Sequence, residues 1–217
     1  QCYNQRKATE FAVEQFKLYN PDYPYFIVSD GGEDFSDIAK KYNTEYCYED
    51  NLTMKLMDGE TALKVVSRIR KYFELSNCQY LLIMEDDLWC RDRIDFDYDF
   101  NAMGANSKNN LFYDEALNFL ADKYKIEIKN KFFNLCGGSI MNRNIFFDHY
   151  DRICEYLKYD HDTVRSMSKE KFSGYEYGGW DSTFNMLYNI CEKEVGINPE
   201  LTETWRDTDW RTNSKKL

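Results

Sequence analysis

The spacing of apolar residues predicts a regular start to the chain. From residue 8 to 19 apolar side chains recur every three or four positions, as on one face of a helix, and Asn20-Pro21 ends that segment. A short apolar run at 25–28 predicts a buried strand, and 29–32 reads as the loop at its carboxyl end. A short helix is expected over 35–42 and a second strand near 45–48.

The next pattern is the longest amphipathic segment in the chain. Apolar residues on one face predict a helix over 59–75, and Asp58 is the expected N-cap. The continuous apolar run at 80–84 then suits a strand that is buried on both faces. Strands alternating with helices in this order favour right-handed crossovers and a mostly parallel central sheet flanked by helices.

Beyond residue 90 the periodicity is weaker. Residues 101–110 are polar enough to predict a loop, and 160–171 a polar connection. The remaining expected elements are helices over 111–123, 144–159 and 182–190, and strands near 132–135 and 140–141. With 217 residues and neither a repeat nor a linker, the chain is expected to form a single α/β domain over 1–217.

Three consecutive acids, Glu85-Asp86-Asp87, fall where the strand at 80–84 should leave the sheet. In open α/β sheets ligands bind beyond the carboxyl ends of strands. Adjoining carboxylates repel one another unless a cation neutralises them, and oxygen ligands suit Mg²⁺ or Mn²⁺. The competing interpretation, a solvated acidic turn after a core strand, stays open at this point.

The composition limits the kinds of molecule that the protein is expected to bind. A net charge of −10 argues against a nucleic-acid backbone or an anionic membrane, but a nucleotide remains compatible because a bound cation supplies positive charge locally. No apolar stretch approaches the about 18 residues of a membrane span. The seven cysteines form no C-x-x-C pair, which speaks against zinc. Their number is odd and several lie in apolar runs, which favours a reducing compartment and a cytoplasmic location, in a host cell if the source is viral.

Glycine doublets occur three times, at 31–32, 137–138 and 178–179. Each could be ordinary turn chemistry, but together with the acidic triplet they favour one ligand cleft, since glycine lets backbone approach a ligand closely. The sequence has no glycine-rich phosphate loop of the P-loop or dinucleotide type. His161 lies in a polar stretch, where metal binding is the less favoured of two interpretations.

The order of these motifs resembles the donor half of GT-A glycosyltransferases. The resemblance runs over about residues 1–190 and includes the start at residues 3–6, the Asp30 turn, the acidic triplet in place of a "DxD" element, and a Gly-Gly-Trp-Asp helix start at 178–181. In overall character the chain is similar to the chlorella-virus capsid-glycan glycosyltransferases. Two departures are the Glu-Asp-Asp order and a first strand that is either missing or cut to Gln1-Cys2.

The resemblance implies roles for particular residues. It implies a GT-A-like, Rossmann-related domain, with a nucleotide-sugar donor half at about 1–90 and an acceptor half at about 91–217. Asp87 matches the metal ligand, for Mn²⁺ or Mg²⁺, and Asp181 the acceptor-side catalytic carboxylate. The nucleotide-binding positions are Tyr3, Asn4, Arg6, Asp30, Lys64 (or Arg68), Glu85 and Asp86, and those of the sugar and acceptor pocket are Gly137, Gly138, Gly179 and Trp180.

The expected function is therefore transfer of a sugar from a nucleotide-diphosphate sugar, most simply a UDP-sugar, to a glycan or protein-linked acceptor, in a bacterial or viral setting. Two alternatives remain. A sugar-1-phosphate nucleotidyltransferase should carry a glycine-rich basic loop after its first strand, and residues 3–7 contain no glycine. A metal-stabilised carbohydrate-binding module needs no nucleoside pocket, so nucleotide binding would separate it from a transferase.

Overall fold

The computed structural model describes residues 1–52, 58–86, 88–90, 92–94, 99–106, 114–130, 133–134, 138–167 and 180–197. Their contacts divide into two compact units. The first unit draws its described residues from Gln1–Leu52 and Ile83–Asp99, and the second draws them from Thr53–Leu82 and Phe100–Thr202. Both units combine helices with strands, so the mixed α/β class expected from the sequence is confirmed.

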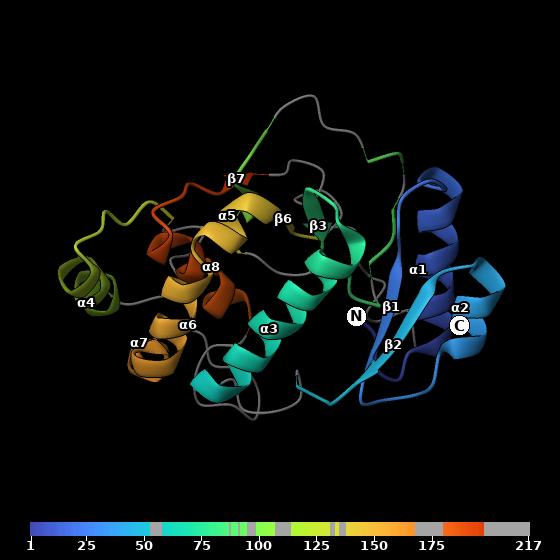
Figure 1. Ribbon diagram of the computed structural model, residues 1–217, viewed down its shortest axis with the longest axis horizontal. Coiled ribbons are helices and arrows are strands. Elements are labelled where there is room, and N and C mark those ends of the chain that lie inside the picture. Colours follow the sequence, from blue (N-terminus) through green and yellow to red (C-terminus); the bar gives the residue numbers. More distant parts are fainter. Residues whose placement is uncertain are drawn as a thin grey trace. The chain divides into compact units, whose positions relative to one another are not determined.

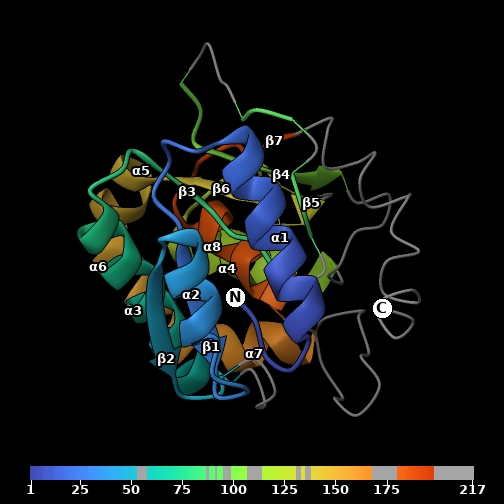
Figure 2. The ribbon, with the colours of Figure 1, turned by 90° about the vertical axis from the view of Figure 1, so that its right-hand side faces the viewer.

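The first unit is built on a parallel strand pair. Its elements are α1 (Arg6–Tyr19), β1 (Phe26–Asp30), α2 (Ser36–Tyr42) and β2 (Glu45–Glu49). Phe26 lies opposite Glu45 and Asp30 opposite Glu49, so β1 and β2 run in the same direction. Figures 1 and 2 show α1 and α2 side by side over one face of this pair. The hydrophobic core between them consists of Cys2, Val13, Ile27, Phe35, Ile38 and Ala39.

The second unit contains a mixed sheet with the described strand order β3-β6-β4-β5, and β7 pairs with β4. The strands are β3 (Tyr80–Leu82), β4 (Ala102–Asn106), β5 (Phe133–Asn134), β6 (Ile140–Asn142) and β7 (Gly196–Ile197). The helices are α3 (Gly59–Ser76), α4 (Asp114–Tyr124), α5 (Arg143–Asp148), α6 (Tyr150–Tyr159), α7 (His161–Ser166) and α8 (Trp180–Ile190). Along α3, the predicted apolar face is buried, and α3 packs against α6 (Figure 1).

A large, mostly parallel central sheet is not shown in the described part of the chain. There, β1 pairs with β2 and β4 with β7 in parallel, whereas β3–β6, β4–β6 and β4–β5 are antiparallel. The strand expected over 80–84 ends at Leu82, and its residues are half-buried instead of buried on both faces. The spacing of hydrophobic residues can predict a strand, but it does not show whether the neighbouring strand is parallel or antiparallel. The prediction of a mostly parallel sheet failed for this reason.

Three other expectations about local structure are wrong. The loop expected over 101–110 contains β4, and the connection expected over 160–171 contains α7. The single helix expected over 144–159 is two helices separated at His149, so Phe146 and Tyr156 are buried while Phe147 and Tyr150 are half-buried.

The start of α3 combines a side-chain cap with a close backbone approach. Asp58 accepts a hydrogen bond from the Thr61 backbone N–H (2.8 Å), which confirms it as the N-cap. Gly59 follows, and its N–H donates to Asp162 Oδ1 (3.0 Å). A Cβ added to Gly59 would lie 2.2 Å from the carbonyl oxygen of Leu157 on α6. The absence of a side chain at 59 is therefore what lets these two helices approach.

Gly59→Ala tests this close helix packing, because the substitution should lower stability if the packing is as described and raise it otherwise. Ala favours a helix over Gly by about 1 kcal/mol, so a helix without this neighbour would be stabilised. Because the Leu157 carbonyl blocks the new methyl, we expect a loss of about 1–3 kcal/mol in the free energy of unfolding, measured by denaturant titration. The matched control is Glu60→Ala, which removes only an exposed partner of Lys64. A Gly59→Ala protein more stable than the parent would contradict the packing described.

Candidate functional site: the carboxyl end of the first-unit strands

Residues Gln1 and Cys2 extend the first-unit sheet beside β1. The Cys2 N–H donates to the Val28 carbonyl (2.9 Å), and the Asp30 N–H donates to the Cys2 carbonyl (2.9 Å). Cys2 and Ser29 form a parallel bridge. The segment around Cys2 therefore runs in the same direction as β1.

On its other side the same segment contacts the residues that carry the acids. The Gln1 nitrogen donates to the Met84 carbonyl (2.5 Å), and the Tyr3 N–H donates to Asp86 Oδ2 (3.4 Å). Both contacts join residues 83 positions apart, so the two segments run in the same direction. Three chain segments distant in sequence thus end together, and they bring Tyr3, Asp30 and Asp86 to one edge of the first unit.

Asp30 is a buried carboxylate with a structural partner. Its side chain is 1% exposed, and Oδ1 accepts a hydrogen bond from the Leu52 N–H (3.1 Å). The carboxylate at the end of β1 therefore holds the segment that follows β2. A nucleotide-binding role for Asp30 stays a prediction, and the contact to Leu52 is one that no local sequence signal could have indicated.

The glycines at 31 and 32 allow close packing of backbone within the first unit and do not line an open ligand cleft. Gly31 has φ +69°, and a Cβ on it would lie 2.7 Å from the Asn51 nitrogen. A Cβ on Gly32 would lie 2.0 Å from the Tyr3 carbonyl oxygen, which also accepts the Glu33 N–H (2.8 Å). The close approach inferred from this doublet is real, but the partner is the chain's own backbone.

Arg6 makes several contacts within the fold, whereas Asn4 is exposed. The Arg6 guanidinium donates to the Asp34 carbonyl (2.9 Å) and to the Asp37 carboxylate, and it lies over the Phe35 ring. The hydrogen bond to Asp37 raises the pKa of Arg6. Asn4 is exposed beyond the end of the Cys2 segment. The structure therefore assigns Arg6 to joining α1 and α2.

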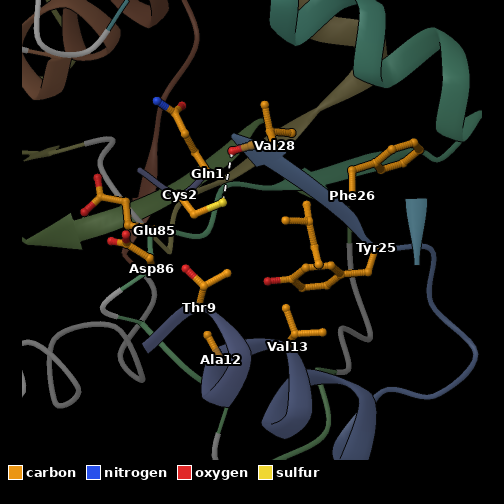
Figure 3. A pocket seen from close by; sticks show the side chains of 11 residues that line it. Gln1, Cys2, Thr9, Ala12, Val13, Tyr25, Phe26, Val28, Glu85 and Asp86 are labelled. Carbon is orange, nitrogen blue, oxygen red and sulfur yellow. Dashed lines mark hydrogen bonds between the residues drawn. The ribbon is translucent and has the colours of Figure 1, made fainter. Parts of the chain in front are cut away.

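A small pocket lies beneath this edge, between α1 and β1 (Figure 3). Glu85, Asp86, Thr9, Cys2 and Tyr25 are among the residues that line it, and its volume of about 10 Å³ has room for roughly one water molecule. The Cys2 thiol donates to the Val28 carbonyl (3.3 Å), and burial raises its pKa to about 11. This pocket cannot hold a nucleotide, and its thiol is protonated at neutral pH.

The other candidate residues that the structure describes belong to the second unit. Lys64 is exposed on α3 and pairs with Glu60 (2.6 Å), while Arg68 on the same helix is buried. Gly138 has φ +84° in the turn before β6. Trp180 and Asp181 are the first two residues of α8. Asp87, Gly137 and Gly179 lie outside the described residues.

His161 is a buried structural histidine and not an open metal ligand. Its Nδ1 lies 3.3 Å from Asp162 Oδ1, and its Nε2 lies 2.9 Å from Thr183 Oγ1. Among the described residues, no group of three or more His, Cys, Asp or Glu side chains could hold a metal ion. Glu85 and Asp86 are the described members of the acidic triplet, and two carboxylates with substrate phosphates can suffice for Mg²⁺.

Comparison with known proteins does not add to this geometry. No protein-family model matches the chain, and no curated protein sequence matches it. Within the described ranges, no helix is both long enough and apolar enough to cross a membrane. The placement of side chains is therefore the basis for assigning a function.

Replacing Asp30 measures its structural role. Asp30→Ala leaves the buried Leu52 N–H without its acceptor, so we expect a loss of about 1–3 kcal/mol in the free energy of unfolding. Asp30→Asn keeps an oxygen at that position and should recover part of the loss. Asp22→Ala, at an exposed carboxylate of the same unit, is the control. Unchanged stability of Asp30→Ala would contradict the role given to this hydrogen bond.

Proposed function

We propose that this protein is a metal-dependent glycosyltransferase of the GT-A type, which transfers a sugar from a nucleotide-diphosphate sugar to a glycan or glycoprotein acceptor. The observation that carries the proposal is the convergence of Tyr3, Asp30 and Asp86 at the carboxyl end of parallel segments in the first unit. Ligands of open α/β sheets bind at such ends. A uridine-based donor is the member of this class that the resemblance favours.

The charge of the site supports a phosphate ligand that arrives with a cation. Glu85 and Asp86 are adjacent, and the chain carries a net charge of −10, so a free diphosphate would be repelled. Carboxylate oxygens are ligands that Mg²⁺ and Mn²⁺ prefer, and these ions commonly bind through one or two carboxylates plus substrate phosphates. The donor set of Glu85, Asp86 and Asp87 fits that chemistry, with Asp87 as the proposed direct ligand.

Different residues of the chain would then have different roles in the transfer reaction. When bound, the metal ion would stabilise negative charge on the leaving diphosphate. Tyr3 and Asn4 would hold the nucleoside, while the buried Asp30 would keep the neighbouring backbone in place through Leu52. Gly137, Gly138, Gly179 and Trp180 would shape the sugar and acceptor pocket. Positioning the acceptor hydroxyl in line with the sugar carbon would supply much of the rate.

Asp181 is the proposed acceptor-side carboxylate. In an inverting reaction it would take the proton from the acceptor hydroxyl as general base. In a retaining reaction it would orient the acceptor instead. Its position as the second residue of α8 supports either role, because backbone N–H groups at a helix start favour the ionised carboxylate.

Titration calorimetry with UDP tests the donor site. We expect UDP to bind much more tightly with Mn²⁺ than with a chelator, because the ion links the carboxylates to the diphosphate. Asp87→Asn should remove most of that metal-dependent gain. Asp22→Asn, at an exposed acid outside the site, should leave it unchanged. Equal metal-dependent binding by Asp87→Asn and the parent would reject Asp87 as the ligand.

Asp181→Asn tests the acceptor side. Asn keeps the size of the side chain and removes its basicity, so transfer should slow by about 10²–10⁴ if Asp181 is the general base. UDP affinity should stay normal, since Asp181 is assigned to the acceptor. The measurement is single-turnover transfer with saturating donor, beside calorimetry on the same variant. Normal transfer by Asp181→Asn would remove this residue from the catalytic set.

A further inference from the structure

We propose that His161 is a positioning residue: through its hydrogen bond to Thr183 it holds the first turn of α8, which carries Asp181. The consequence for sugar transfer rests on the proposed function. The mechanical part, that one buried hydrogen bond fixes the start of α8, stands on the geometry of the second unit alone.

The contact joins two helices at their beginnings. His161 is the first residue of α7, and Thr183 is the fourth residue of α8. Their side chains meet at 2.9 Å, and the residues are 2% and 4% exposed. Because both residues are buried, water does not reach the contact, and removing either partner loses a hydrogen bond that solvent cannot replace.

The other ring nitrogen orients the imidazole. Asp162 Oδ1 lies 3.3 Å from His161 Nδ1 and also accepts the Gly59 N–H at the start of α3 (3.0 Å). Because an ionised carboxylate can only accept, Nδ1 carries the hydrogen. Nε2 of the neutral ring is then an acceptor, and the Thr183 hydroxyl donates to it. Asp162 therefore fixes the tautomer that can hold Thr183.

The neutral state of His161 follows from what surrounds it. Burial lowers its pKa, and the Arg165 charge on α7 acts in the same direction. Asp162 and Asp58 oppose this shift, and the Tyr156 ring of α6 packs edge-on against the imidazole. At pH 7 the ring is therefore uncharged and keeps the acceptor nitrogen that the contact to Thr183 needs.

The opposite end of α8 is held separately. Asn189 Oδ1 accepts the backbone N–H groups of Lys129 and Asn130 (3.1 and 2.9 Å). Removing the His161 contact should for this reason loosen the first turn while the last turn stays in place. This difference between the two ends makes the role measurable.

Hydrogen exchange of α8 is the direct test. Amides at 184–187 donate to the carbonyls of the first turn, whereas those at 188–190 donate farther along the helix. In Thr183→Val, which removes the hydroxyl but keeps the shape, we expect exchange at 184–187 to rise about tenfold, with 188–190 nearly unchanged. His161→Leu should give the same pattern. Thr183→Ser should restore protection, and Ser166→Ala on exposed α7 surface is the control.

The same variants separate positioning from general stability in a transfer assay. Thr183→Val should lower kcat about tenfold to a hundredfold, with the donor KM unchanged and Thr183→Ser close to the parent. If the parent transfers no sugar, the proposed function fails while the exchange pattern still decides the role of His161. Exchange unchanged at 184–187, or accelerated equally over the whole helix, would overturn the proposal.

Discussion

The first unit depends on the backbone pairing of Cys2 with β1. Two hydrogen bonds, from the Cys2 N–H to Val28 and from the Asp30 N–H to Cys2, fix a short extended segment in the direction of the sheet. That segment also presents Gln1 and Tyr3 to the residues around Glu85 and Asp86. This pairing therefore helps to bring the end of β1 and the acidic residues to one edge of the first unit.

At that edge, the backbone of Tyr3 and the side chain of Asp30 both have partners within the protein. The Tyr3 carbonyl accepts the Glu33 N–H and lies close to Gly32, so this backbone group already has a partner within the fold. Asp30 is likewise engaged by Leu52. The feature that the proposed ligand site rests on is the pair of sequence-adjacent acids, Glu85 and Asp86, of which Asp86 also accepts the Tyr3 N–H. The negative charge of these acids is the basis for proposing that a diphosphate binds there together with a metal ion.

Local signals were sufficient for much of the fold. The amphipathic face and the Asp58 cap predicted α3, and Asn20 marked the end of α1, because these features act within a few residues. Strand direction and the helix at His161 depend on partners far along the chain, so local signals could not predict them. For the site, residue types at the ends of strands were informative, while the partners of Asp30, Arg6 and His161 were visible only after folding.

The central claim is that Tyr3, Asp30 and the acidic triplet form one site for a nucleotide diphosphate and its metal ion. Paramagnetic broadening of backbone NMR signals by Mn²⁺ in the presence of UDP measures this directly, because the effect falls steeply with distance from the ion. We expect broadening at Tyr3, Asp30 and residues 84–86 that deepens when UDP is added, with α2 signals at Lys40 and Lys41 unaffected. Broadening confined to other residues, or identical with and without UDP, would contradict the account.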